Sequence, residues 1–334
     1  MKRRREQRVL IASFLAPALL LFTVFVAVPG VRALGYSLRR WDGLSEPQWV
    51  GLRNFVSLFR DSDLFLVALR HNVFLMAVGG SLTLALALFF AAVLHRRIRG
   101  ANVFRVAFFF PNVISSVAIA LLWVLLYSTT EFGVINSLLV YLQDFFVALG
   151  EEARPGWPFP FNVLDLVLPP FQGLFAWMEA LWARLDLPFA FFDSKNVICA
   201  IVPMMVWTAT GFYMVLFLAA MENIPETFYE AAKLDGASAF AQFRYITFPL
   251  IREVFTVGMV FLVIGSLKFF DAIWVIENQW PTKDSHVLAT VLYQKVFTEY
   301  NVGYGSAVAV LLFALVFVGT LLTLRLSRRE ALEY

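Results

Sequence analysis

The sequence predicts an all-α membrane protein with six transmembrane helices and both termini on one side of the bilayer. Hydrophobic residues make up 60% of the 334 residues and charged residues only 15%. The mean hydropathy is +0.74, so the chain carries too much apolar surface for a water-soluble exterior. Six segments reach the roughly 20 apolar residues that a membrane helix needs. An even number of spans returns the chain to its starting side.

The six predicted spans differ in how completely they exclude charge. The first, 9–31, follows a basic cluster and ends near an expected turn at Pro29 and Gly30. It is longer than the apolar core of a secretory signal, about 7 to 15 residues, so we expect it to remain as a membrane helix. Lys268 and Asp271 interrupt 254–276. The first span and the remaining four are free of Asp, Glu, Lys and Arg: 9–31, 72–94, 106–127, 196–221 and 302–324.

The distribution of Lys and Arg orients the chain. Of 27 basic residues, 15 lie on the short segments that share a side with the termini. The outer segments are longer, and their basic residues are mixed with acidic ones. Cytoplasmic loops carry the excess of Lys and Arg, so the N- and C-termini are expected in the cytoplasm.

The polar segment 222–252, between the fourth and fifth spans, predicts a first short helix over about 225–235. Pro225 suits the first turn of a helix, and Glu226 complements the positive end of the helix dipole. Gly236 offers the left-handed backbone that commonly ends a helix.

A second helix is expected directly after the first. Ser238 is suited to cap it, 239–247 would form its body, and Pro249 is expected to end it before the fifth span. Helices this short are marginal alone. We therefore expect their apolar side chains to bind in a groove on a cytoplasmic partner. These side chains are Phe228, Tyr229, Leu234 and Phe240.

This segment resembles the coupling loop of the permease subunits of bacterial ABC importers. The family motif E-A-A-x-x-x-G runs from Glu230 to Gly236, and the tail I-x-x-P-L runs from Ile246 to Leu250. The resemblance implies that these residues contact an ATP-binding subunit. The residues expected at this contact are Glu230, Ala231, Ala232, Asp235, Gly236, Ile246 and Pro249.

Other segments extend the resemblance over most of the chain. They are Gly51 to Phe55, Phe104 to Pro111, Phe132 to Asn136 and Gly303 to Ala307. They are similar to the sugar-type permeases, in the subgroup of the maltose and glycerol-phosphate systems. The resemblance implies a type I ABC-importer permease fold in the bacterial inner membrane, formed by a single domain over 1–334.

The same resemblance names the partners. It implies a second permease of the same fold, two ATP-binding subunits and an external solute-binding protein, all around a path through the lipid bilayer. The chain itself lacks the phosphate-binding motif G-x-x-x-x-G-K-[ST], so ATP hydrolysis is expected on another chain. No catalytic site, cofactor or nucleic-acid partner is expected. A metal site is not expected either, because His71, His95 and His286 are scattered without metal-ligand spacing.

The substrate path is expected on the fourth and fifth spans. Charge inside a membrane is costly and usually functional. Lys268 and Asp271, three residues apart, are expected on one helix face, where they either neutralise each other or line the path. Trp207, Thr210 and Tyr213 are expected near one stripe that faces a saccharide, and a packing role is the alternative for Tyr213. The full predicted set is Trp207, Thr208, Thr210, Tyr213, Ser266, Lys268 and Asp271.

An extended outer loop, 143–193, departs from the family pattern. Its stretch 172–185 carries Trp177 and Trp182 and is too short and too charged to cross a membrane, so we expect a helix on the outer surface. It either touches a partner or packs at the bilayer boundary.

The expected function is that of a permease that forms the translocation path for a sugar, oligosaccharide or polyol. An ion-coupled secondary transporter is the alternative. That class needs acidic residues or interrupted helices at mid-membrane, and five of the spans here contain no charge.

Overall fold

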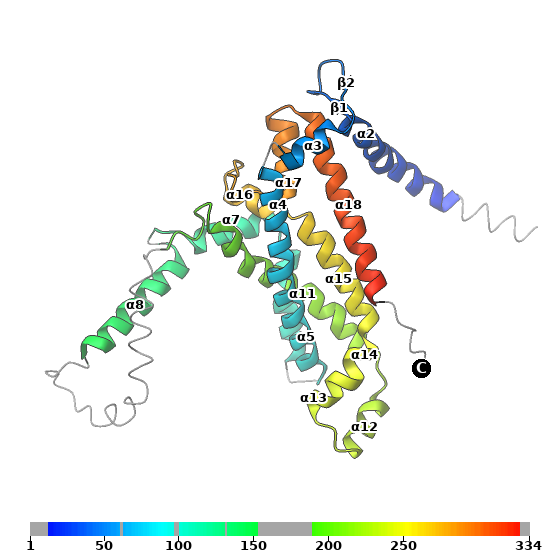
Figure 1. The fold of residues 1–334 in the computed structure, drawn as a ribbon. Helices are drawn as coiled ribbons and strands as arrows, with labels where there is room; N and C mark the ends of the chain where they lie inside the picture. Colours follow the sequence, from blue (N-terminus) through cyan, green and yellow to red (C-terminus); the bar gives the residue numbers. More distant parts are fainter. Residues whose placement is uncertain (1–12, 61–62, 97–99, 131, 153–188, 328–334) are drawn as a thin grey trace, which may run out of the picture.

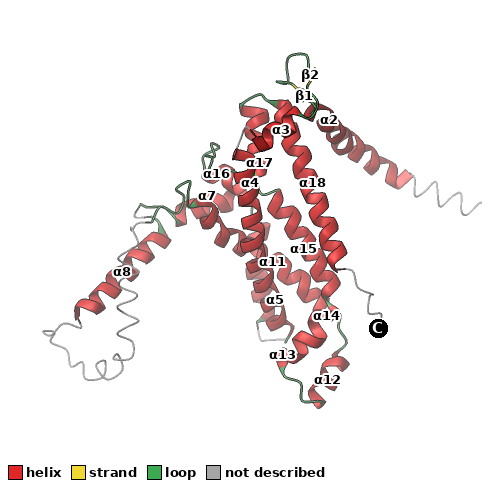
Figure 2. Cartoon of the chain, viewed as in Figure 1, coloured by secondary structure: helices red, strands yellow, loops and turns green. Residues whose placement is uncertain are grey.

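The computed structural model describes residues 13–60, 63–96, 100–130, 132–152 and 189–327. Within them most of the chain is helical, loops connect the helices, and the strands form one short hairpin (Figure 2). Long helices form a bundle, while the N-terminal helix and α8 (Val134–Glu152) extend away from it in opposite directions (Figure 1). Most of the extended outer loop and the predicted surface helix at 172–185 lie outside the described residues.

The N-terminal helix runs from Ser13 to Ser37 and includes α2 (Val28–Ser37). The expected turn at Pro29 and Gly30 is therefore wrong. Proline in a helix loses a hydrogen bond and presses on the carbonyl four residues earlier. Here a π-helical turn, η1 (Thr23–Ala27), directly precedes α2 and widens the backbone at that point.

A hairpin follows at one end of the bundle. β1 (Arg39–Arg40) pairs antiparallel with β2 (Gln48–Trp49), and α3 (Arg53–Arg60) comes next. The Asn54 amide nitrogen donates to the carbonyl oxygens of Ser37 at 2.8 Å and Arg39 at 2.9 Å. Asn54 thus holds the backbone where the chain leaves the C-terminal end of the N-terminal helix.

The second long helix starts nine residues before the expected span. It runs from Asp63 to His95 and consists of three parts. These are α4 (Asp63–Phe74), the π-helical η2 (Leu75–Gly80) and α5 (Ser81–His95).

The third predicted span is not one straight helix. α6 (Ala101–Val113) and α7 (Ser116–Leu126) meet at a bend of 99°. Ile114 and Ser115 have extended backbone there, with ψ of 145° and 132°. The reason is local, because Pro111 leaves a backbone carbonyl without its helical donor and Ser115 favours a cap over a helix interior.

The fourth helix, α11 (Val197–Glu222), lies inside the bundle against α5, α6 and α15. α15 (Arg252–Leu267) and α16 (Asp271–Ile276) follow, separated by a break at residues 268–270. The chain ends with α17 (Leu288–Tyr293), η5 (Gln294–Thr298) and α18 (Val302–Ser327).

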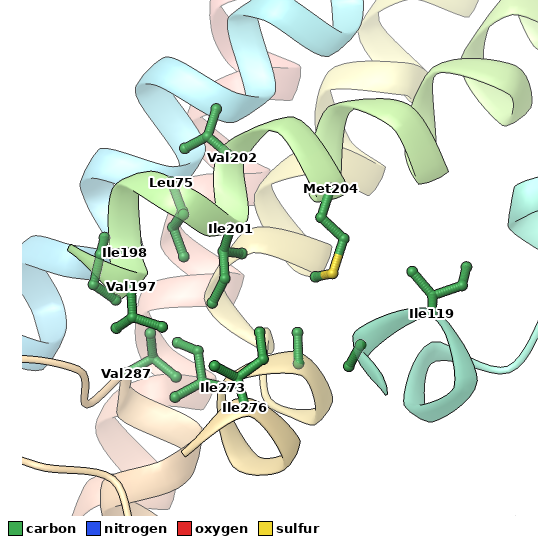
Figure 3. Packing of buried hydrophobic residues seen from close by; sticks show 12 residues of the cluster. Leu75, Ile119, Val197, Ile198, Ile201, Val202, Met204, Ile273, Ile276 and Val287 are labelled. Carbon is green, nitrogen blue, oxygen red and sulfur yellow. The ribbon is translucent and has the colours of Figure 1, made fainter. Parts of the chain in front are cut away.

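Three clusters of buried apolar side chains hold these helices together, and one of them joins α3, α4, α17 and α18. The other two lie at the functional parts of the bundle. One joins α11, α16 and the start of α17, and Figure 3 shows Ile201, Ile273 and Val287 converging in it. The other lies nearer α12 and contains Met214 and Phe217. At Gly211 the helices approach so closely that an added Cβ would lie 1.9 Å from the Phe108 carbonyl oxygen.

Among the described residues, five helices are long and apolar enough to cross a membrane, and six if the bent pair α6–α7 counts as one span. The bounds of the six spans and the cytoplasmic position of the termini stay predictions.

We predict that the segment around Ser238 faces the cytoplasm and that the loop around Asp284 faces outward, following the distribution of Lys and Arg. Both residues are exposed, whereas neighbouring Ser285 is fully buried. Single cysteines replacing Ser238 or Asp284, with exposed Cys199 changed to Ala, would be treated with an impermeant maleimide in spheroplasts. Cysteine at 284 should be labelled and cysteine at 238 should not. Labelling at 238 in sealed spheroplasts would contradict the orientation.

Candidate functional site: a coupling segment and a cavity at two helix breaks

The coupling segment forms a short helix, a left-handed turn and a second helical stretch. α12 (Glu226–Leu234) begins after Pro225 and ends where Gly236 adopts a φ of +76°. A non-glycine residue is disfavoured in that conformation, so glycine is needed here for its backbone. Ser238 then caps α13 (Ala239–Gln242), and its hydroxyl accepts from the Ala241 N–H at 3.2 Å.

The second helix continues through η4 (Phe243–Thr247) and α14 (Phe248–Leu250) and ends at a turn at Ile251, before α15 begins at Arg252. It therefore ends one residue after Pro249, close to the predicted end. A π-helical turn again precedes the proline, as it does before Pro29, and proline is tolerated in the first turn of a helix. The coupling segment is therefore joined to α15 with little interruption.

Two interactions hold α12 in place, one with η4 of the same segment and one with the end of α5 in the bundle. The Tyr229 and Thr247 hydroxyl groups form a hydrogen bond of 3.0 Å, and the ring centroids of Tyr229 and His95 are 5.5 Å apart. Burial raises the pKa of the Tyr229 phenol, so this hydroxyl stays neutral. Tyr229, expected to dock on a partner, instead faces the bundle.

The opposite side of the coupling segment is unusually apolar for a surface. Leu234 is 90% exposed, and Phe240 and Tyr245 are each 76% exposed. Glu230 and Ala231 are also exposed on α12, Ala232 is half-buried, and Asp235 forms the C-cap. Ile246 and Pro249 are half-buried. Large exposed apolar side chains gathered on one short segment are typical of a protein interaction surface.

A cavity of about 680 Å³ lies between the coupling segment and the bundle. Its wall includes Tyr229 and Thr247, together with an ion pair in which the Arg105 guanidinium lies 2.5 Å from the Glu222 carboxylate. Both of these side chains are partly exposed, so the pair contributes little to stability. It does connect α6 to the end of α11.

A second cavity, which we call the bend cavity, lies where the α6–α7 bend faces the α15–α16 break. Its volume is about 420 Å³. α11 closes it with Met204, Met205 and Thr208. Its polar wall residues are Asn112, Ser116, Thr208, Lys268 and Asp271.

Lys268 and Asp271 do not share a helix face, so the predicted pairing along one helix is wrong. α15 ends before Lys268, and Asp271 starts α16. The two side chains form no ion pair within 4.0 Å among the described residues. Asp271 instead accepts a hydrogen bond of 2.6 Å from the Ser116 hydroxyl, which joins the two breaks across the cavity.

The predicted stripe on the fourth span is divided in the structure. Thr208 lines the bend cavity, whereas Thr210 and Tyr213 are buried and Trp207 is 40% exposed outside it. Three residues advance a helix by about 300°, which is about 60° short of a full turn, so positions 207, 210 and 213 do not lie on one narrow face.

Ser266 is buried, and its hydroxyl has no hydrogen-bond partner among the described residues. The transport roles of all these residues stay predictions.

Sequence reasoning missed Asn112 and Ser116. Their signal was present, because a proline followed within five residues by two adjacent serines is unusual inside an apolar helix. No group of three or more His, Cys, Asp or Glu side chains that could hold a metal ion occurs in the described part of the chain.

Comparison with known proteins identifies the family. Residues 83–331 match the family described as binding-protein-dependent transport system inner membrane component. The chain belongs to this family. It is an inner-membrane permease, and its relatives give the alternative of an ion-coupled carrier no support.

Individual relatives align with nearly the whole length of this chain. The permease is 30% identical to the diacetylchitobiose uptake system permease protein NgcF of Streptomyces coelicolor, over 95% of this chain and 81% of that one. It is 25% identical to the probable starch degradation products transport system permease protein AmyD of Thermoanaerobacterium thermosulfurigenes, over 96% and 94%.

A solved structure shares the fold. It is a chain of a bacterial alginate ABC transporter in complex with an alginate pentasaccharide-bound periplasmic protein. The TM-score is 0.75 at 19% identity, over 99% of this permease and 98% of that chain. The type I ABC-importer permease fold implied by the coupling motif is thereby confirmed.

We predict that Tyr213 acts in packing. Its ring lies beside Phe212 and Phe217 and within van der Waals reach of Gly258, among the apolar cluster near α12. Tyr213→Ala should cost about 3 to 5 kcal/mol of stability by leaving a cavity. The purified complex should melt at a lower temperature, with cargo preference unchanged, and Tyr213→Phe should melt like the wild type. An unchanged melting temperature with altered cargo preference would return Tyr213 to the substrate path.

Proposed function

We propose that this permease forms the translocation path for a saccharide or polyol, which an external solute-binding protein delivers and ATP hydrolysis on a separate subunit drives. The bend cavity carries the proposal. It combines donors and acceptors, on Lys268, Asp271 and Asn112, with apolar walls from Met204 and Phe270. Few well-placed polar groups in an otherwise apolar pocket suit the hydroxyl groups and the C–H faces of a sugar.

The relatives support the same class of cargo. NgcF is named for diacetylchitobiose and AmyD for starch degradation products. The solved neighbour carries an oligosaccharide-bound periplasmic protein. By analogy, this permease would pair with a second permease of the same fold, and two ATP-binding subunits would dock on the cytoplasmic side.

The coupling segment supports the docking of an ATPase. The sequence contains no phosphate-binding loop of its own. An apolar groove on a cytoplasmic subunit would cover Leu234, Phe240 and Tyr245, whose exposure would otherwise be unfavourable in water.

The path from ATPase to cargo runs along one chain segment. The Tyr229–Thr247 hydrogen bond ties α12 to η4, and Ile251 N–H donates to the Thr247 carbonyl just before α15. α15 has 16 residues, or about 24 Å, and ends at the break that lines the bend cavity. Movement of α12 on ATP binding would therefore displace Lys268 and Asp271, as alternating access requires.

We predict ATP-dependent uptake of a saccharide by the reconstituted complex. Proteoliposomes holding this permease, its partner permease and the ATP-binding subunits would be offered their binding protein with radiolabelled maltotriose or N,N′-diacetylchitobiose. Loss of a hydrogen bond to a charged group should lower uptake about tenfold in Lys268→Gln and in Asp271→Asn.

Lys283→Gln is the matched control, because Lys283 is a charged residue that pairs with Asp63 away from the cavity. It should transport normally. Uptake driven by a sodium or proton gradient without ATP would contradict the importer mechanism. Uptake that is equally weak in Lys283→Gln and Lys268→Gln would remove the bend cavity from the path.

We predict that Gly236 is required for coupling because of its backbone and not because of crowding. An added Cβ would meet nothing within 4 Å, yet a β-branched residue strongly resists a φ of +76°. Gly236→Val should weaken retention of the ATP-binding subunit by about tenfold, from about 1 to 2 kcal/mol of strain. Gly236→Asn should retain it, because asparagine tolerates this conformation. Equal retention in both variants would show that the turn is not needed for docking.

A further inference from the structure

Asn72 lies fully buried in α4, near the α15–α16 break, and its side chain satisfies three backbone groups. Its amide nitrogen donates to the Ser266 carbonyl at 2.7 Å and to the Leu267 carbonyl at 3.4 Å. Its amide oxygen accepts from the Leu288 N–H at 2.9 Å. One side chain therefore contacts the end of one helix and the start of another.

These three backbone groups need an outside partner. Ser266 and Leu267 lie in the last turn of α15, where carbonyls have no donor within the helix. Leu288 is the first residue of α17, where an N–H has no acceptor within the helix. Asn72 satisfies both helix ends in a place where buried, unpaired backbone groups are costly.

A neighbouring contact reinforces this arrangement. The His71 ring nitrogen Nδ1 lies 2.7 Å from the His286 carbonyl oxygen, two residues before Leu288. α4 thus holds the segment that leads into α17 at two adjacent positions. The break in the fifth span is fixed from outside the helix that contains it.

The break is also the part of the fifth span that reaches the bend cavity. Lys268, Phe270 and Asp271 line it, and Asp271 meets Ser116 there. In a continuous helix Lys268 and Asp271 would lie near one face. The break instead places Lys268 after the end of α15 and Asp271 at the start of α16. The direction of both charged side chains therefore depends on the carbonyls that Asn72 holds.

We propose that Asn72 is a positioning residue for transport, which holds the α15–α16 break open so that Lys268 and Asp271 face the bend cavity. Asn72 does not line that cavity itself. Its importance for cargo rests on the function proposed above, whereas its effect on the geometry of the break does not.

The test measures the break directly. Cysteines replacing Ser116 and Asp271, with Cys199 changed to Ala, report the distance across the cavity through the rate of reaction with the shortest bis-methanethiosulfonate cross-linker. A second pair, replacing Arg105 and Glu222, reports the contact at the other end of the bundle. Both pairs are introduced into the assembled complex with wild-type Asn72, Asn72→Asp, Asn72→Leu or Thr83→Val.

Asn72→Asp keeps the size but replaces the NH2 group, which donates to two carbonyls, by a carboxyl group that offers at most one O–H donor. Asn72→Leu loses both the donor and the acceptor. Either variant should slow cross-linking of the 116–271 pair about tenfold, which corresponds to about 1.4 kcal/mol, and leave the 105–222 pair unchanged. Thr83→Val removes a buried hydroxyl whose bond, among the described residues, is to the Gly79 carbonyl of the same long helix, so it should slow neither pair.

Equal slowing of both pairs by Asn72→Asp and Asn72→Leu would overturn the proposal, because it indicates a general loss of structure. Wild-type cross-linking of the 116–271 pair in these variants, or failure of both to assemble, would overturn it as well. Cross-linking needs no saccharide, so this outcome stays separate from the cargo experiment. If the complex imports maltotriose or N,N′-diacetylchitobiose, Asn72→Asp should also raise the ratio of ATP hydrolysed to saccharide imported.

Discussion

The rest of the site depends on one constraint, the need to satisfy backbone groups wherever a membrane helix is interrupted. Water is absent from the hydrocarbon core, so an interrupted helix survives only where protein groups or a water-filled cavity replace the lost hydrogen bonds. This permease has a bend of 99° in its third span and a local break at residues 268–270 in its fifth, and residues of both line the bend cavity. Asn72 supplies donors to the carbonyls at the end of α15, and the Ser116 hydroxyl reaches Asp271 across the gap. The cavity is a consequence of these two breaks.

The same constraint explains the tolerance of proline near the helix ends. Pro29 and Pro249 each follow a π-helical turn, η1 and η4, which relieves contact with the carbonyl four residues earlier. The helix is thereby continued at Pro29, whereas past Pro249 it runs on only to Leu250. A turn at Ile251 then leads into α15, so the coupling segment lies one residue away from the helix that ends at the charged residues of the bend cavity.

The coupling segment and the bend cavity are built differently. At the coupling end, apolar side chains are left exposed around a rigid turn, which suits docking to another protein. At the bend cavity, charged and hydroxyl groups are brought together and the apolar residues form walls. Between them lie α11 and α15, which contact each other.

The sequence by itself determined the features that depend on neighbouring residues. Apolar length indicated the long helices, Gly236 indicated the left-handed turn, and Ser238 indicated the cap, since each signal acts within a few residues along the chain. Only the tertiary structure decided the shape of the cavity. Asn72 and Ser266 are 194 residues apart, and Ser116 and Asp271 are 155 apart, so no local pattern could reveal that these pairs meet. The spacing of Lys268 and Asp271 suggested one helix face, and it misled because the break between them is stabilised by a side chain from another helix.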